Sequence, residues 1–179
     1  MPFGFDLFVF ELFSLQNKYK GFKLIKKSDS PTMMFLIWFF KIITFGKSRF
    51  EKYHSLFGKT LFLGEDWDTK MLWVDKVLVI RHEEKHLEQI MSCSFGIFWL
   101  GFLIFSLMYL FLPLPAFFTF RGFWFEKEAY QEDMKNCARL NCEFNEKATV
   151  EKFLSLDYFY MFTWRKSVEK WFNDESIQT

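Results

Sequence analysis

The sequence predicts a mainly α-helical protein of the α+β class, with one small antiparallel β-hairpin and apolar helices that contact a membrane. Two long segments, 70–93 and 122–140, have the apolar spacing of helices. A turn signal at Gly58-Lys59 lies between two short apolar runs, as in a hairpin. Half of the residues are hydrophobic and 28 are Phe, and side chains of this kind must be packed, dimerised or placed in lipid.

The length of 179 residues suits one domain with its own core. We expect a single domain, 1–179, in three parts: an N-terminal apolar and basic segment at 1–49, a core at 50–140 with an apolar insertion at 95–120, and a C-terminal helical cap at 141–179.

The charge balance argues against a polyanionic partner. The formal charge is +1, from 23 basic and 22 acidic side chains, which provides no net field for counterion release. We therefore expect no nucleic-acid partner. Residues 1–13 contain Asp6 and Glu11 and lack the basic start of a secretory signal, so we expect no export by that route.

The first fifty residues predict one clear helix. Residues 1–13 fit either a helix or a strand. A lysine-rich patch, 18–27, ends at a Ser-Asp-Ser-Pro turn, and Pro31 suits the first turn of a helix at 33–45. That helix is apolar except for Lys41, and it is shorter than the ~20 residues that span a bilayer, so we expect it to be buried or to lie in an interface.

The middle of the chain predicts a hairpin, a long helix and a membrane segment. The hairpin covers 50–63, and Asp68 or Thr69 is placed to cap the helix at 70–93. Residues 95–112 have Ser106 as their only clearly polar side chain and form the strongest membrane signal in the chain. Beyond the helix at 122–140, two amphipathic helices are expected, at 148–155 and 158–172.

Chemistry is suggested by the motif His82-Glu83-Glu84-Lys85-His86 on the first long helix. Residues four apart on a helix share a face, so the two histidines can direct their imidazoles at one ion. Glu83 then lies beside the ion, where a carboxylate can take a proton from a zinc-bound water. With three His in the chain a chance match is rare, but a solvated face of charge pairs is the alternative.

This motif resembles that of the gluzincin metallopeptidases, especially the membrane-linked M48-like group and small proteins with an HExxHxxQ helix followed by an ExEAY helix. The resemblance runs from Thr60 to Tyr130 and includes Gln89 as the final Gln. It implies a zincin-like helix pair, a Zn²⁺ cofactor and a third ligand from the first Glu of an ExxA pattern. Glu126 takes that place, with Glu128 in reserve.

Ligand histidines normally need a hydrogen-bond acceptor that fixes their tautomer. In the M48-like pattern an Asp follows the Ala, whereas this chain has Tyr130. Asp133, seven residues after Glu126, or Asp75, seven before His82, is positioned to substitute. The residues expected around the ligands are Asp75, Gln89, Glu128, Tyr130 and Asp133.

The resemblance also implies a substrate-binding edge strand before the motif helix, formed by Thr60, Leu61, Phe62 and Leu63. A plain structural hairpin is the alternative. A single crossing of the bilayer by 95–112 would separate Glu126 from the histidines, so 95–120 must either double back in the membrane or cover the protein as an apolar layer. The resemblance favours the membrane hairpin.

The sequence therefore predicts a zinc-dependent peptidase at or near a membrane, with a peptide or protein substrate, lipid contact and a site on the cytoplasmic side. Two alternatives are a non-catalytic membrane-associated protein that retains the zincin-like scaffold, and a helical membrane protein without metal.

Overall fold

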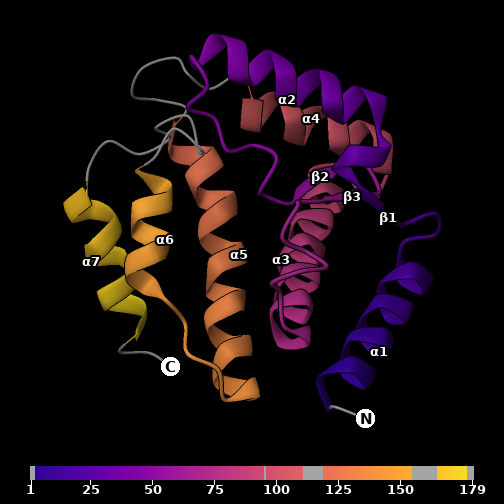
Figure 1. Cartoon of the computed structure of the whole chain (residues 1–179). Helices are drawn as coiled ribbons and strands as arrows, with labels where there is room; N and C mark the ends of the chain where they lie inside the picture. The colour runs from indigo at the N-terminus through magenta and orange to yellow at the C-terminus, as the bar shows by residue number, and fades with distance from the viewer. Residues whose placement is uncertain (1–2, 95, 111–118, 155–164, 177–179) are drawn as a thin grey trace. The chain divides into compact units, whose positions relative to one another are not determined.

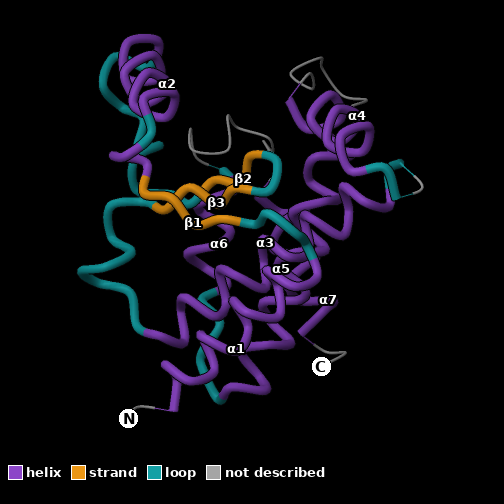
Figure 2. Tube along the Cα trace, turned by 90° about the vertical axis from the view of Figure 1, so that its right-hand side faces the viewer, coloured by secondary structure: helices purple, strands orange, loops and turns teal. Residues whose placement is uncertain are grey.

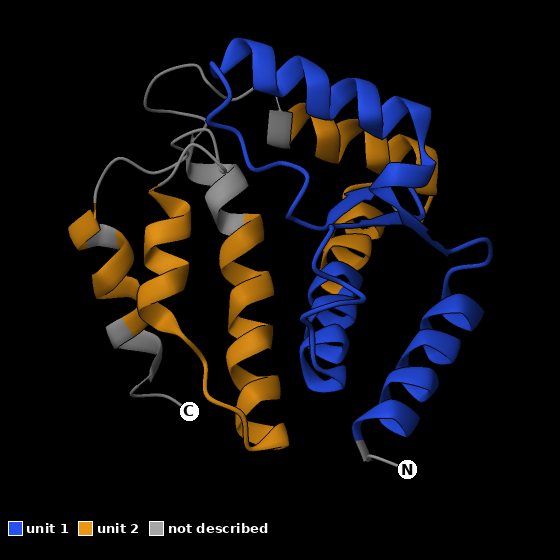
Figure 3. Ribbon diagram, in the orientation of Figure 1, with its two compact units in different colours: residues 1–84 blue, residues 85–179 orange. Residues whose placement is uncertain are grey.

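The computed structural model describes residues 3–94, 96–110, 119–154 and 165–176. In these residues the chain is mainly helical and contains one small mixed sheet (Figure 1). It divides into two compact units, unit 1 at 1–84 and unit 2 at 85–179 (Figure 3). The boundary falls within one continuous helix, α3 (Trp73–Ser92).

Unit 1 begins with a helix in the segment whose type the sequence left open. Its elements are α1 (Phe3–Lys18), β1 (Lys23–Lys26), the 3₁₀ turn η1 (Lys27–Asp29), α2 (Pro31–Ile43), β2 (Ser55–Phe57), β3 (Thr60–Leu63) and the first part of α3. The predicted start of α2 is confirmed, because Ser30 accepts a hydrogen bond from Met33 N at 3.4 Å and Pro31 occupies the first turn.

The sheet is built around β3, as the tube in Figure 2 shows. β2 pairs with β3 antiparallel across Gly58, whose φ of 60° suits the turn, so the predicted hairpin is confirmed. β1 pairs with β3 in parallel on its other side and was not predicted. The expectation that 60–63 form an edge strand is therefore wrong, because both backbone edges of β3 are hydrogen-bonded within the sheet.

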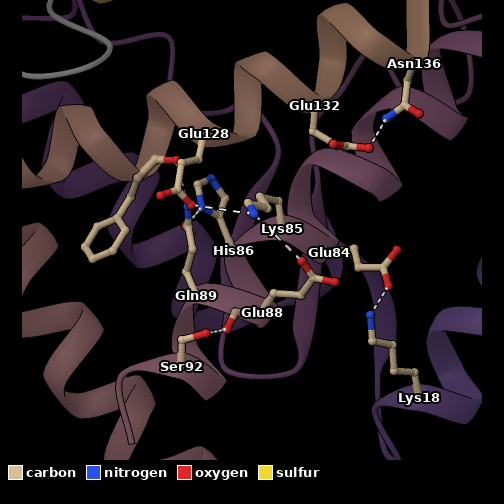
Figure 4. Close-up of polar contacts among 11 residues, drawn as sticks. Lys18, Glu84, Lys85, His86, Glu88, Gln89, Ser92, Glu128, Glu132 and Asn136 are labelled. Carbon is tan, nitrogen blue, oxygen red and sulfur yellow. Dashed lines mark hydrogen bonds and ion pairs between the residues drawn. The ribbon is translucent and has the colours of Figure 1, made fainter.

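Helix α3 begins three residues later than predicted, and neither Asp68 nor Thr69 caps it. Instead Asp75, in its first turn, accepts a hydrogen bond from Leu72 N at 3.0 Å, which satisfies an amide at the helix start. Within unit 1, Lys18 of α1 pairs with Glu84 of α3 at 2.7 Å (Figure 4), and Glu11 pairs with Arg81 one turn earlier. These pairs attach α1 to the motif helix.

Unit 2 holds the C-terminal part of α3 together with α4 (Phe98–Leu110), α5 (Thr119–Leu140), α6 (Glu146–Phe153) and α7 (Arg165–Ser176). The last three lie side by side in Figures 1 and 2. Their shared core consists of Tyr130, Val150, Phe153, Val168, Trp171 and Phe172. The predicted cap helix at 158–172 falls partly on 155–164, outside the described residues.

Helix α4 covers part of the predicted membrane segment, of which residue 95 and residues 111–118 lie outside the described part of the chain. Among the described residues, we find no helix with the length and apolar character needed to cross a bilayer. A Cβ at Gly101 would lie 2.0 Å from the Ile90 carbonyl oxygen, so glycine lets α4 pack directly on α3. Phe105, one turn later, is also buried.

Candidate metal centre

The motif helix presents both histidines from one face. Its apolar side buries Val77, Ile80, Leu87 and Ile90 almost completely, and this burial fixes the rotation of the helix. His82 and His86 lie one turn apart on the continuous helix, so the helix itself sets their spacing. His82 is partly buried and His86 is 6% exposed.

Helix α5 brings the third predicted ligand to His86 within unit 2. Glu126 is 2% exposed, and its Oε1 lies 3.5 Å from His86 Nε2. His82 joins this pair through α3, and one donor atom from each of the three side chains lies within 4.8 Å of the others. The structure thus brings together the two histidines and the acid that the sequence singled out.

The distance between His86 Nε2 and Glu126 Oε1 suits a small ion better than a direct hydrogen bond. A nitrogen and an oxygen that share a proton normally lie about 2.7–3.2 Å apart. Donor atoms that bind a tetrahedral ion at ~2 Å lie about 3.3 Å from one another, close to the 3.5 Å between His86 Nε2 and Glu126 Oε1. Two imidazoles and one carboxylate are a known donor set for catalytic zinc, so the residues fit this metal.

Gln89 determines which nitrogen of His86 is available to an ion (Figure 4). Its Nε2 donates to the Phe125 carbonyl at 3.0 Å, and a carbonyl can only accept, so the amide oxygen must face the other way. That oxygen lies 2.9 Å from His86 Nδ1 and accepts its proton. His86 therefore carries a hydrogen on Nδ1, and Nε2 is the ring nitrogen that faces Glu126.

Glu128, the reserve ligand, has a different position from Glu126. Its Oε2 accepts a hydrogen bond from Gln89 Nε2 at 3.1 Å and lies 3.6 Å from Lys85 Nζ. Figure 4 shows Glu128 in contact with Gln89 and Lys85. Glu128 therefore supports the amide that orients His86, while Glu126 faces the opposite ring nitrogen.

Aromatic rings cover His86 within unit 2. The ring of Phe105, from α4, has its centroid 5.9 Å from that of His86 and 4.8 Å from that of Phe125. These rings restrict water on this side of the imidazole, which strengthens electrostatic interactions there. The sequence does not single out Phe105, because nothing distinguishes it from the other aromatics of its segment.

The general base predicted by the motif, Glu83, is 8% exposed. Lys27, which the sequence shows only as part of a basic patch, interacts electrostatically with Glu83 within unit 1. Lys27 is 3% exposed, and its Nζ donates to the Phe50 carbonyl at 2.6 Å. Burial lowers the pKa of Lys27 to about 8, while the charges of Glu51 and Glu83 oppose that shift. Lys27 and Glu83 therefore interact electrostatically.

Two of the residues expected around the ligands, Asp75 and Tyr130, are placed elsewhere. Asp75 sits at the start of α3, about 10 Å along the axis from His82, and binds Leu72 N. Tyr130 packs in the C-terminal core, where its hydroxyl accepts from Lys152 Nζ at 3.1 Å. Asp133 is buried on α5, seven residues beyond Glu126, and its role beside a ligand stays a prediction. For His86, the contact with Gln89 replaces the orienting role expected of Asp75.

The remaining histidine, His54, makes contacts that stabilise the fold. His54 Nδ1 accepts a hydrogen bond from Gly64 N at 3.1 Å, so its proton is on Nε2, which lies 3.2 Å from Met71 Sδ. Its ring packs edge-on against Trp67. His54 thus ties the hairpin to the segment that follows it.

No family model, curated protein or solved structure matches this chain. Its function must accordingly be inferred from its own residues and their geometry.

Proposed function

We propose that the protein is a zinc-dependent metallopeptidase that acts at or near a membrane, with His82, His86 and Glu126 as ligands and Glu83 as general base. The observation that carries this proposal is the donor group itself, in which His86 Nε2 faces Glu126 Oε1 at 3.5 Å. The Gln89 contact supports it further, because it prepares His86 for binding a cation.

The chain's own residues divide the work of peptide hydrolysis. When bound, zinc supplies Lewis acidity, which lowers the pKa of a water molecule and polarises a carbonyl. A carboxylate oxygen of Glu83 accepts the proton of the attacking water and passes it to the leaving amine. Lys27, buried in unit 1, acts electrostatically on Glu83. His86, held by Gln89, stays in one tautomer throughout.

In this proposal α3 and α5 form the zincin-like helix pair, with HExxH on the first helix and ExxA on the second. The burial of Ala129, which is 0% exposed, supports this role for the second pattern. A small residue there lets α5 pack closely while Glu126, one turn earlier, stays on the ligand side.

The test combines metal analysis with a matched pair of acid variants. Full-length protein is purified without chelator, its zinc content is measured, and hydrolysis is followed with a library of fluorescence-quenched peptides. We expect one zinc per chain, loss of zinc in His86→Ala, and retention of zinc in Glu83→Gln with hydrolysis reduced about 10²- to 10⁴-fold. Glu84→Gln is the control, since Glu84 is the neighbouring acid and pairs with Lys18.

Two results would reject the peptidase: wild-type protein that binds no zinc, or Glu83→Gln protein that hydrolyses peptides as fast as Glu84→Gln protein.

One observation favours a second candidate, a non-catalytic membrane-associated protein that retains the scaffold. The strand expected to bind substrate, β3, is paired on both sides, so it has no free edge for an extended peptide. This candidate predicts stoichiometric zinc without hydrolysis of any peptide in the library. It also predicts that Glu83→Gln changes nothing while His86→Ala lowers stability, as for a structural metal site.

A further inference from the structure

Helix α2 carries an exposed apolar face that nothing in unit 1 covers. Five large side chains share this face and are 41–57% exposed: Met34, Phe35, Trp38, Phe39 and Ile42. Phe45, just after the helix, is 93% exposed. At 100° per residue the five side chains fall within one half of the helix. A contiguous apolar surface of this kind marks a contact site in a folded protein.

The opposite face of α2 holds the helix on unit 1. Met33 is 3% exposed, and Leu36, Ile37 and Phe40 are partly buried. The Phe40 ring packs against that of Phe50 with centroids 5.1 Å apart. The helix is thus apolar on both sides, and one of these sides packs against the rest of unit 1. Ordinary surface helices expose polar residues on their outer face, so α2 requires another apolar partner.

Cations border the exposed face. Lys47 and Arg49 follow Phe45 closely and are exposed, and 31–50 contain no acidic residue. Within the part of the chain that the structure describes, neither cation has an acidic side chain within ion-pair distance. Lys41, on the flank of the helix, pairs with Glu51 at 3.1 Å. The surroundings of the apolar face are therefore positively charged.

We propose that the exposed face of α2 lies at the boundary between the headgroups and the acyl chains of an anionic lipid membrane, with Lys47 and Arg49 on the lipid phosphates. The helix has 13 residues, or about 20 Å, too short to cross a ~30 Å hydrocarbon core and suited to lying in its surface. Trp38, in the middle of the face, is the side chain most enriched at this depth. The face meets acyl chains, while each cation meets a phosphate.

The charges favour lipid over a second copy of the chain. If two copies paired through α2 about a twofold axis, Lys47 and Arg49 of each copy would approach those of the other, and neither has an acid within ion-pair distance among the described residues. An anionic bilayer instead presents the opposite charge beside the apolar layer. The apolar face of α2 therefore matches the acyl chains of such a membrane, and the adjacent cations match its anionic headgroups.

The test is co-sedimentation of the full chain with vesicles of phosphatidylcholine alone and of phosphatidylcholine mixed with phosphatidylserine. We expect tighter binding to the mixed vesicles, and binding that weakens with salt. Lys47→Glu with Arg49→Glu should weaken binding to mixed vesicles at least tenfold. Lys135→Glu with Arg139→Glu, the same charge change at two exposed positions of α5, should leave it within about twofold.

A second variant pair tests the apolar face. Trp38→Glu with Phe45→Glu should abolish binding to either vesicle, whereas Phe10→Glu, on the 65% exposed Phe10 of α1, should not change it. Both sets alter exposed side chains, and circular dichroism checks that the fold is kept. Trp38→Phe should bind like wild type and show less quenching by brominated lipid, because Trp38 is placed among the acyl chains.

Three results would overturn the proposal. The first is that the Trp38→Glu/Phe45→Glu variant binds vesicles as strongly as wild type does. The second is that wild-type protein binds to neither kind of vesicle. The third is a lipid-free dimer that this variant dissociates, because a second copy would then occupy the face. Zinc content is measured on the same variants and should stay unchanged, so the membrane proposal and the peptidase proposal can fail separately.

Discussion

His86 Nδ1 donates a hydrogen bond of 2.9 Å to Gln89 Oε1, and this contact sets the chemistry of the opposite ring nitrogen. The direction of the bond follows from the Phe125 carbonyl, which binds the other end of the Gln89 amide. The Phe125 carbonyl of α5 therefore fixes the orientation of the Gln89 amide, and that amide fixes the tautomer of His86 on α3.

Loss of the Gln89 amide should weaken zinc binding without removing a ligand. We expect Gln89→Leu to lower the zinc affinity 10- to 100-fold, because His86 loses the acceptor that holds its tautomer. Gln89→Glu restores an acceptor but places a second carboxylate beside Glu128. Adding Glu128→Gln should remove that repulsion and recover affinity, as measured by chelator competition. A purely packing role for Gln89 would instead leave the double variant as weak as Gln89→Leu.

The two glutamates of the EKEA stretch should differ sharply in metal binding. Glu126→Gln removes the oxygen that faces His86 Nε2, so the zinc content after dialysis should fall to near zero. Glu128→Gln keeps all three donors, and its amide still contacts Gln89, so zinc should stay at one per chain. Metal analysis of the two variants decides the ligand, and equal zinc content in both would remove Glu126 from the site.

Gly101 should be an exception to the rule that alanine stabilises a helix more than glycine does. Replacing an exposed helical glycine by alanine stabilises a protein by about 1 kcal/mol. At Gly101 the new Cβ would lie 2.0 Å from the Ile90 carbonyl oxygen, a backbone atom that cannot yield easily. We therefore expect Gly101→Ala to lower the free energy of unfolding by about 1–3 kcal/mol in denaturant titrations. Leu103→Ala, at a 55% exposed position of α4, should change it far less.

Local patterns were sufficient to predict much of the fold. The spacing of His82 and His86 depends only on helix geometry, and the hairpin depends on a turn two residues long. Strand β1 was missed because Lys23–Lys26 is short, has two lysines, and owes its conformation to parallel pairing with β3, 37 residues later in the sequence. That same pairing makes β3 central, which one-dimensional patterns cannot show.

The site was predictable where a motif names residue types at fixed spacing, as for the histidines, Glu83 and the EKEA acids. Lys27 and Phe105 reach their places through tertiary packing, and each resembled many similar residues in the sequence. The helix-start role of Asp75 also went unrecognised, since it depends on where α3 begins by a few residues.

Lys27 should give the protein a characteristic dependence of stability on pH. Its pKa is about 8 in the folded chain against 10.5 when unperturbed, so between these values the unfolded chain binds more protons. The Lys27 contribution to stability is therefore present above about pH 10.5 and is lost as the pH falls through about 8. Its size is on the order of 3 kcal/mol.

The measurement compares wild type with Lys27→Met, in which the titrating group is absent and the other ionisable groups cancel. We expect the free energy of unfolding of wild type, minus that of the variant, to rise as the pH increases from 8 to 10.5. Lys23→Met, at an exposed lysine of β1, is the matched control and should give a flat difference. A flat difference for Lys27→Met as well would mean that Lys27 keeps an ordinary pKa. Lys27 would then make no pH-dependent contribution to the free energy of unfolding between pH 8 and 10.5.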